Sequence, residues 1–342
     1  MNQLITSIIA LLFSFVLTVV CITLFLKMMR HFNMFQIINP DAPESHMEKK
    51  NTPTAGGVTF LVSTTVSCIL FADITDPFIY LPLIAMWGYG LVGLADDVMK
   101  LTKKENQGLT SLRKLAMQIL IAALLYYIVD NTSGLLLRKV SAFWNPQIEF
   151  DIGLWFPIAF LLYMVIFVNA VNISDGLDGL AASVTISPLF LLFIIGSMFA
   201  FVSAVQPTQV IINSGASSLI VLIAIVIGSL LAFLWFNGYK AQLFMGDAGS
   251  HAIGACIGMS ALLMKVEFII AFASGVLIIE LISSFIQIVS IRLFNRKVFL
   301  LAPLHHHFEL KGAHESKIVT RFFIASIILT FAAALFFMIK YR

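Results

Sequence analysis

The amino-acid sequence predicts an all-α, polytopic membrane protein with about ten transmembrane helices, and three observations support this fold class. Of the 342 residues, 60% are hydrophobic and only 11% are charged, and the mean hydropathy is +0.98. Uninterrupted apolar runs long enough to cross a bilayer recur along the chain. The basic residues gather in alternate connections between these runs. This composition excludes a soluble domain of the same size.

Ten apolar segments are candidate spans, and we expect them to form one integral membrane domain over residues 1–342. The first segment is too long for a signal peptide and lacks a small-residue cleavage site, so we expect it to be retained. Cys21, Cys68 and Cys256 lie singly in apolar runs, which suggests neither a disulfide framework nor a zinc site. The expected spans are 4–30, 57–72, 78–95, 112–130, 153–171, 178–202, 214–236, 249–264, 268–292 and 318–339.

The distribution of Lys and Arg predicts the orientation of the chain. An even number of spans places both termini on one side of the membrane. One set of connections, with the neighbouring span ends, carries most of the 21 basic residues, which makes this set cytoplasmic and both termini periplasmic. The cytoplasmic set consists of 31–56, 96–111, 172–177, 237–248 and 293–317.

The central motif N-A-V-N-I-S-D-G-L-D-G-L, residues 169–180, joins the fifth and sixth spans. Each carboxylate would cost about 2.5 kcal/mol or more at the bilayer centre, so Asp175 and Asp178 should lie at the membrane edge or in a wet cleft. Their i, i+3 spacing places both on one face of a helical turn, near Asn172. The two glycines allow a polar ligand to approach the backbone. The simpler alternative is a polar cap between two spans.

Two further carboxylate motifs lie in cytoplasmic connections. Asp96 and Asp97 at the end of the third span point to different faces of a helix, and Lys100 is a natural i+4 partner of Asp96. Lys114 adds a cation after the connection. Asp247, between two glycines, is either an N-cap of the eighth span or an oxygen ligand for Mg²⁺. An ordinary charged helix end remains the alternative for the Asp96 pair.

The remaining polar groups suit phosphate binding. Lys49 lies in the loop before the second span, close to Thr54, and a solvated basic loop is the alternative there. His305, His306 and His307 are consecutive and therefore do not share a helix face, which favours oxyanion or hydrogen-bonding roles over zinc. Surface histidines remain the alternative. Within the ninth span lie Glu280 and, two turns further on the same face, Gln287.

All five motifs fall on the same predicted side of the membrane. Carboxylates for Mg²⁺, together with lysines and histidines for phosphates, indicate phosphoryl chemistry at a membrane face. The chain has no P-loop, which argues against a nucleotide hydrolase. A transporter would more often place its ionisable groups near the middle of the membrane.

Read together, these motifs resemble the phospho-N-acetylmuramoyl-pentapeptide transferase family (translocase I, MraY) of the polyprenyl-phosphate N-acetylhexosamine-1-phosphate transferase superfamily. The resemblance covers nearly the whole chain, and the run from His305 to Glu309 is its most specific part. The matching strings, in order, are T-P-T-A-G-G, A-D-D-V-M-K, N-A-V-N-I-S-D-G-L-D-G-L, F-M-G-D-A-G-S and A-P-L-H-H-H-F-E-L-K-G.

The resemblance implies the first membrane step of peptidoglycan synthesis. Phospho-MurNAc-pentapeptide would pass from UDP-MurNAc-pentapeptide to undecaprenyl phosphate, giving lipid I and UMP, with Mg²⁺ as cofactor. The active site would lie on the cytoplasmic face of the inner (plasma) membrane, in contact with membrane lipid. The resemblance implies no nucleic-acid partner and leaves a homodimer open.

Site residues carry over from the family by position. The implied catalytic residues are Asp96, Asp97, Asp175, Asp247 and His305, with Asp247 and Asp175 as metal ligands. The implied substrate-binding residues are Lys49, Thr54, Lys100, Lys114, Asn172, Asp178, Asn237, Phe244, Gln287, His306 and His307. The chain departs from the family pattern at Ala55 (usually Met), Lys240 (often Pro) and Ala313-His314 (often Trp-Pro), and none of these changes removes a charged group.

Three questions stay open on the sequence. The lipid phosphate attacks directly, with Asp96 accepting a proton or orienting it, or the reaction has two steps through a phosphorylated Asp175 or Asp96. The chain could also be a polyprenyl-phosphate transferase for another UDP-sugar. A transporter of a lipid-linked substrate is the more distant alternative.

Overall fold

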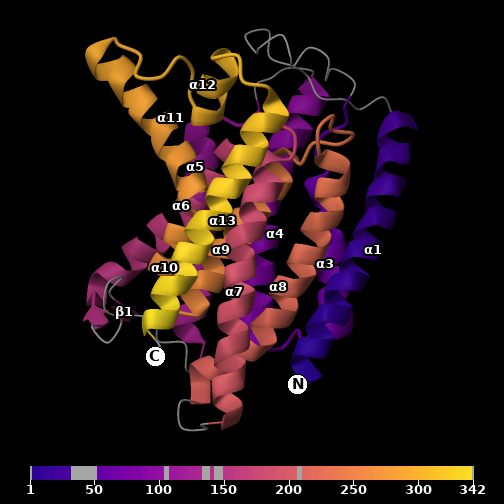
Figure 1. Ribbon diagram of the computed structural model, residues 1–342, viewed down its shortest axis with the longest axis vertical. Helices are drawn as coiled ribbons and strands as arrows, with labels where there is room; N and C mark the ends of the chain where they lie inside the picture. The colour runs from indigo at the N-terminus through magenta and orange to yellow at the C-terminus, as the bar shows by residue number, and fades with distance from the viewer. Residues whose placement is uncertain are drawn as a thin grey trace.

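A computed structural model describes residues 2–31, 52–103, 108–132, 139–141, 149–205 and 210–340 of the protein, and nearly all of them are helical (Figure 1). Two short strands, β1 (Lys139–Ser141) and β2 (Glu149–Asp151), pair antiparallel with Lys139 opposite Asp151, and the 3₁₀ turn η1 (Gly153–Trp155) follows. The helices are α1 (Asn2–His31), α3 (Gly57–Phe71), α4 (Pro77–Lys103), α5 (Ser111–Asn131), α6 (Phe156–Ser174), α7 (Leu180–Val205), α8 (Val210–Asn237), α9 (Gly246–Leu263), α10 (Glu267–Ala273), α11 (Gly275–Phe294), α12 (Leu304–Leu310) and α13 (Glu315–Lys340).

The predicted all-α membrane fold is confirmed. Eight of the described helices are long and apolar enough to cross a membrane, and α3 is a shorter apolar helix. A helix occupies each of the ten expected positions. Figure 1 places both ends of the chain at the end of the bundle opposite α12. The number of ten crossings and the periplasmic side of the termini stay predictions.

The expected span 268–292 differs from the structure, where it is two helices, α10 and α11. The helical backbone is interrupted at Ser274, and α11 begins at Gly275. The absence of a side chain at Gly275 lets α13 approach closely, since a Cβ there would lie 2.9 Å from Leu329 Cδ1. Glycine is also a poor helix former, so an interruption at this point costs little.

The outer surface of the bundle is apolar. On α1, Leu12, Val16 and Leu24 are each more than half exposed, and Leu120 on α5 and Phe331 on α13 are exposed as well. Exposed apolar surface of this extent marks an interface with another apolar phase in a folded protein. The pattern fits a bundle surrounded by lipid.

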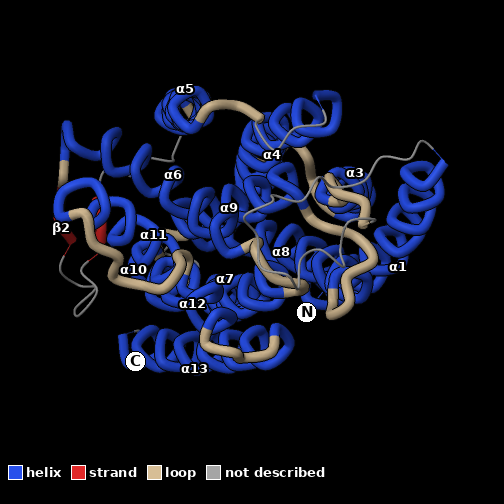
Figure 2. The backbone as a smooth tube through the Cα atoms, turned by 90° about the horizontal axis from the view of Figure 1, so that it is seen from above, coloured by secondary structure: helices blue, strands red, loops and turns tan. Residues whose placement is uncertain are grey.

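Helix α9 lies at the centre of the bundle. Every residue from Ala248 to Leu263 is buried, and α4, α6 and α3 pack against the helix (Figure 2). Glycine, alanine and serine make up much of α9, which allows neighbouring backbones to approach closely. A Cβ on Gly254, for example, would lie 2.6 Å from the carbonyl oxygen of Phe167.

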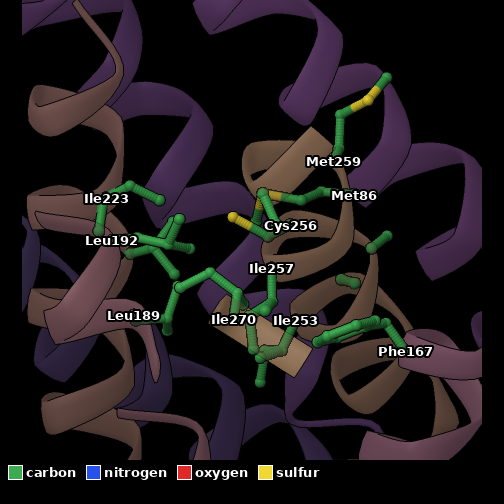
Figure 3. Packing of buried hydrophobic residues seen from close by; sticks show 14 of the residues in the cluster. Met86, Phe167, Leu189, Leu192, Ile223, Ile253, Cys256, Ile257, Met259 and Ile270 are labelled. Atoms are coloured by element: carbon green, nitrogen blue, oxygen red, sulfur yellow. The ribbon is translucent and has the colours of Figure 1, made fainter. Parts of the chain in front are cut away.

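The deeper part of α9 is enclosed by large apolar side chains. Figure 3 shows Ile253, Cys256 and Ile257 in a cluster that includes Met86 from α4 and Phe167 from α6. Close packing of this kind fixes the height and rotation of a helix. The N-terminus of α9 therefore has a defined position at the end of the bundle.

Replacing Gly93 with alanine tests the packing of α4 against α9. A Cβ at Gly93 would collide with the backbone carbonyl of Asp247, which has no rotamer to change. We expect a destabilisation of about 1–3 kcal/mol, even though alanine is the better helix former. The measurement is the thermal unfolding midpoint of the purified protein in detergent micelles.

The matched control is Gly88→Ala on the same helix. Its Cβ would lie 3.1 Å from Ile121 Cγ2, the end of a side chain that can shift. A midpoint for Gly93→Ala equal to those of the control and the wild type would contradict the close packing of α4 on α9.

Candidate active site

The N-terminus of α9 is capped by a carboxylate from another helix. The backbone N–H groups of Asp247 and Ala248 each donate to one carboxylate oxygen of Asp97 on α4, at 3.1 Å. A carboxylate at this position satisfies two of the unpaired amides of the helix and complements its dipole. The possibility that Asp247 is itself the N-cap is wrong, because Met245 precedes the helix and Asp247 lies in its first turn.

Two aspartates and two lysines form an ion-pair cluster beside this terminus. The ammonium of Lys100 lies 2.6 Å from Asp96 Oδ2 and 3.4 Å from Asp247 Oδ2. That of Lys114, on α5, lies 2.6 Å from Asp247 Oδ2 and 3.3 Å from Asp96 Oδ2. Each charge therefore touches two charges of opposite sign. The expected i, i+4 pair of Asp96 and Lys100 is present.

Neutral groups complete the coordination of these carboxylates. The side-chain amide of Asn172, on α6, donates to Asp247 Oδ1 at 2.9 Å and to the hydroxyl of Ser250 at 3.0 Å. The backbone N–H of Leu109 donates to Asp96 Oδ1 at 2.7 Å. Asp96 is almost completely buried, while Asp247 and Lys114 stay partly accessible. The cluster is thus accessible at Asp247 and at the two lysines, of which Lys100 is the more exposed.

Ser250 was not singled out from the sequence. It lies three residues after Asp247, a spacing that places the two on one helix face. This spacing is the feature of the sequence that could have identified Ser250 as a site residue.

The carboxyl groups of Asp247 and Asp175 have opposite pKa shifts. Burial favours the protonated form of Asp247, but the ammonium groups of Lys100 and Lys114 outweigh this effect and hold its pKa below the ordinary value. Asp175 follows the last residue of α6. Burial, and then the negative charges of Asp247, Asp97 and Asp178, raise the pKa of Asp175 to about 8. Groups with pKa values moved apart in this way are typical of functional sites.

Three carboxylates form a group that could hold a metal ion. Asp96, Asp97 and Asp247 each offer an oxygen, and the three oxygens lie within 4.8 Å of one another. Hard oxygen ligands are those that Mg²⁺ prefers, so the donor set fits that ion. Within the described residues, this group does not include Asp175, which the family resemblance pairs with Asp247.

The second aspartate of the central motif supports the neighbouring loop. Asp178 Oδ2 accepts from the backbone N–H of Ala241 at 2.9 Å, and the backbone N–H of Asp178 donates to Glu315 at 2.6 Å. The Asn237 amide accepts from Gly179 N–H at 3.0 Å and donates to the Leu243 carbonyl at 2.8 Å. Both residues therefore fix the loop that leads into α9. No local pattern in the sequence pointed to Glu315.

The same loop also pairs with the segment before α3. The backbone of Phe244 donates to the Pro53 carbonyl and accepts from Gly56 N–H, both at 2.9 Å. Phe244 is half-buried, and Thr54, between these contacts, is buried. The pairing joins two of the predicted motifs. The implied phosphate-binding residue Lys49 lies outside the described residues.

The triple-histidine motif forms the short helix α12 beside α11. His305 is buried, its Nδ1 lies 2.9 Å from Glu280, and its ring lies against Gly176 of the central motif. His306 Nδ1 lies 3.0 Å from Glu309, and His307 Nδ1 accepts from the backbone N–H of Leu300 at 3.1 Å. His305 is therefore in contact with the central motif.

Gln287 binds the backbone of the segment that precedes α12. Its side chain accepts from the backbone N–H groups of Val298 and Phe299 and donates to the Phe299 carbonyl. These bonds occupy both ends of the amide. Its assignment as a substrate-binding residue stays a prediction.

The structure thus gathers Asp96, Asp97, Lys100, Lys114, Asn172 and Asp247 in one cluster at the end of the bundle. The fold and the site define an integral membrane protein that presents paired acidic and basic groups to a polar substrate.

Comparisons with known proteins identify the family to which this membrane protein belongs. Residues 79–265 match the model of glycosyl transferase family 4. A phospho-N-acetylmuramoyl-pentapeptide-transferase from Desulfotalea psychrophila is 38% identical over 313 residues, which cover 90% of this chain and 85% of the relative. Proteins of the same name from Geobacter sp. (strain M21) and Buchnera aphidicola are 39% and 35% identical, over 87% of this chain and 83% and 88% of their own lengths. The chain belongs to the phospho-N-acetylmuramoyl-pentapeptide-transferases of glycosyl transferase family 4.

The Asp175→Asn substitution tests whether ionisation of Asp175 destabilises the folded protein. The carboxyl of Asp175 titrates near pH 8 in the folded protein and near about 3.9 when unfolded. Between these values the folded state retains a proton that the unfolded state has lost, so this group lowers stability as the pH rises. Asparagine does not ionise and lacks this penalty.

We therefore expect the thermal midpoint of Asp175→Asn to exceed that of the wild type by an amount that grows between about pH 4 and pH 8. The measurement is a series of unfolding scans of both proteins over that range. A difference that is constant or shrinks as the pH rises would contradict the raised pKa of the Asp175 carboxyl.

Proposed function

We propose that this protein transfers phospho-MurNAc-pentapeptide from UDP-MurNAc-pentapeptide to undecaprenyl phosphate, with UMP and lipid I as products. The names of its relatives support this reaction. The observation that carries the proposal is the cluster of Lys100 and Lys114 with Asp96 and Asp247. Both substrates are anions, and two ammonium groups close together provide a place where two phosphate-bearing molecules can meet. The proposed location is the inner membrane, with the site facing the cytoplasm.

The reaction exchanges one phosphorus–oxygen bond for another. An oxygen of the lipid phosphate forms a bond to the sugar-linked phosphorus of the UDP-sugar. The bond from that phosphorus to the bridging oxygen breaks, and the oxygen leaves on UMP with the electron pair. Lys100 and Lys114 hold the phosphates in line for this displacement and neutralise their charge. These residues all come from one chain.

We propose Mg²⁺ as the cofactor, with Asp247 as its principal ligand. Asp96 offers a further oxygen within 4.8 Å, whereas Asp97 uses both of its oxygens to cap α9. Asp175 is the ligand that the family resemblance adds. When bound, the ion supplies charge neutralisation to the diphosphate and the leaving group. Asn172 holds Asp247 by its other oxygen and thereby keeps the carboxylate turned toward the lysines.

We propose direct attack by the lipid phosphate, with separate roles for the two adjacent aspartates. Asp97 caps α9 with both oxygens and therefore positions Asp247. Asp96 is ion-paired with both lysines. It is placed to orient the lysines or to accept a proton. We place Asp175 and His305 beside this cluster as further reaction-site residues.

Asp247→Asn tests the assignment of the metal ligand. Loss of the charged ligand should lower the rate of UMP release by about 100-fold or more, while the protein still inserts into the membrane. The assay uses purified protein, both substrates and Mg²⁺. Asp73→Asn is the control, since Asp73 is an exposed residue in the α3–α4 connection. Wild-type turnover of Asp247→Asn at ordinary Mg²⁺ would remove the assignment.

UMP release under defined substrates separates the proposed reaction from its alternatives. We expect release to require UDP-MurNAc-pentapeptide, undecaprenyl phosphate and Mg²⁺ together. Release with UDP-GlcNAc in place of the muramoyl substrate would indicate a transferase for another sugar. Substrate movement across liposomes without UMP release would indicate a transporter. Labelled phospho-protein formed without lipid phosphate would support the two-step route.

A further inference from the structure

A polar stripe on α11 binds a neighbouring loop along its length. Glu280, Ser283, Gln287 and Ser290 recur at spacings of three and four residues, so they share one face of a mostly apolar helix. The loop is the segment from Arg296 to His305. Each side chain of the stripe forms a hydrogen bond with the backbone of this segment. Ser290 binds Arg296, Gln287 binds Val298 and Phe299, Ser283 binds Leu304, and Glu280 binds His305. The loop runs back along the helix and ends at the first histidine of α12.

Glu280, at the end of the stripe, binds both the backbone and the side chain of His305. Glu280 Oε1 accepts from the backbone N–H of His305 at 3.1 Å, and Oε2 lies 2.9 Å from His305 Nδ1. Both side chains are almost completely buried. With Glu280 as a carboxylate, which has acceptors only, the proton of this bond belongs to Nδ1. The second nitrogen of a neutral ring, Nε2, is then unprotonated.

The charge state of the ring agrees with this assignment. Burial lowers the pKa of His305, although the hydrogen bond to Glu280 acts in the opposite direction. A lowered pKa favours the neutral imidazole at physiological pH, and the neutral ring carries a single proton.

The unprotonated nitrogen faces the central motif. A Cβ on Gly176 would collide with His305 Nε2, so the ring lies directly against the backbone that follows Asp175. Nε2 is buried and has no hydrogen-bond partner among the described residues. The bare nitrogen is a buried acceptor without a donor. A proton on it would add an atom to this close contact and a buried donor without an acceptor, which is the costlier arrangement. The contact between ring and turn therefore depends on which nitrogen carries the proton.

We propose that Glu280 is a positioning residue for the transfer reaction: it fixes the Nδ1–H tautomer of His305, so that the bare Nε2 packs against Gly176 and holds the Asp175 turn in place. The inference rests on the proposed function, because it assumes that the placement of Asp175 matters for turnover. Glu280 acts through His305 and does not itself touch the substrate.

Glu280→Gln separates this role from a simple structural one. The backbone N–H of His305 requires an acceptor, and glutamine has one oxygen, so that oxygen takes the place of Oε1. The amide NH₂ then faces Nδ1 and donates to it. Nδ1 becomes an acceptor, and the proton of the ring moves to Nε2. The variant thus keeps the shape and the backbone bond but reverses the tautomer.

The tautomer is read directly by ¹⁵N NMR of histidine-labelled protein in lipid nanodiscs, with the His305 signals identified from a His305→Gln sample. We expect a protonated Nδ1 and an unprotonated Nε2 in the wild type, and the reverse in Glu280→Gln. A protonated Nε2 in the wild type, or an unchanged tautomer in the variant, would overturn the inference. If the variant does not fold, the wild-type spectrum by itself tests the predicted tautomer of His305.

Kinetics test whether the tautomer matters. For Glu280→Gln we expect kcat for UMP release to fall by about 10- to 100-fold, with KM for both substrates changed by less than about two-fold. Ser290→Ala is the matched control, because it removes a bond of the same stripe far from His305 and should leave kcat unchanged. In a His305→Gln background, Glu280→Gln should have little further effect on kcat.

The outcomes distinguish this inference from the proposed function. A reversed tautomer with wild-type kcat would overturn the inference and leave the transfer reaction intact. Absence of UMP release from wild-type protein with both substrates and Mg²⁺ would instead refute the proposed function, while the NMR result would still report the tautomer.

Discussion

The arrangement of the site depends on the mutual neutralisation of two carboxylates and two ammonium groups. Asp96, Asp247, Lys100 and Lys114 each touch two groups of opposite charge. A buried charge without a partner would cost several kcal/mol (about 3–5 when one partner of a buried pair is removed). The ends of three helices, α4, α5 and α9, must therefore meet at one point, because the cluster is neutral only when all its members are in place.

This balance also suits the proposed chemistry. Entry of a divalent cation and of phosphates allows the carboxylates to pair with the cation and the lysines to pair with the phosphates. The charges change partners without a large change in net charge, so the site need not expose an uncompensated group to lipid. Asp97 is excluded from this exchange, since its oxygens cap α9. Its hydrogen bonds to the N-terminus of α9 keep the backbone of Asp247 in place while the charged groups around Asp247 change their ion-pair partners.

The sequence predicted the helices well and the contacts between motifs poorly. Apolar runs and the i, i+4 pair of Asp96 and Lys100 are local features, and the structure contains both. The cap that Asp97 provides to α9 joins residues 150 positions apart, and no local pattern encodes such a contact. The break at Ser274 was missed because α10 and α11 are both apolar, so hydropathy alone does not separate them.

The polar residues within α11 show that a location predicted from the sequence does not by itself reveal the contacts of a side chain. A polar residue inside a span is by default a functional hypothesis, and the sequence placed Glu280 and Gln287 on one face. In the structure their side chains bind the segment that returns to α12. A long helix that leaves the bundle, as α11 does in Figure 1, needs such bonds to hold a loop in register. The stripe therefore fixes the position of His305 relative to α11. Its proposed influence on the reaction comes from the orientation that it gives to the His305 ring.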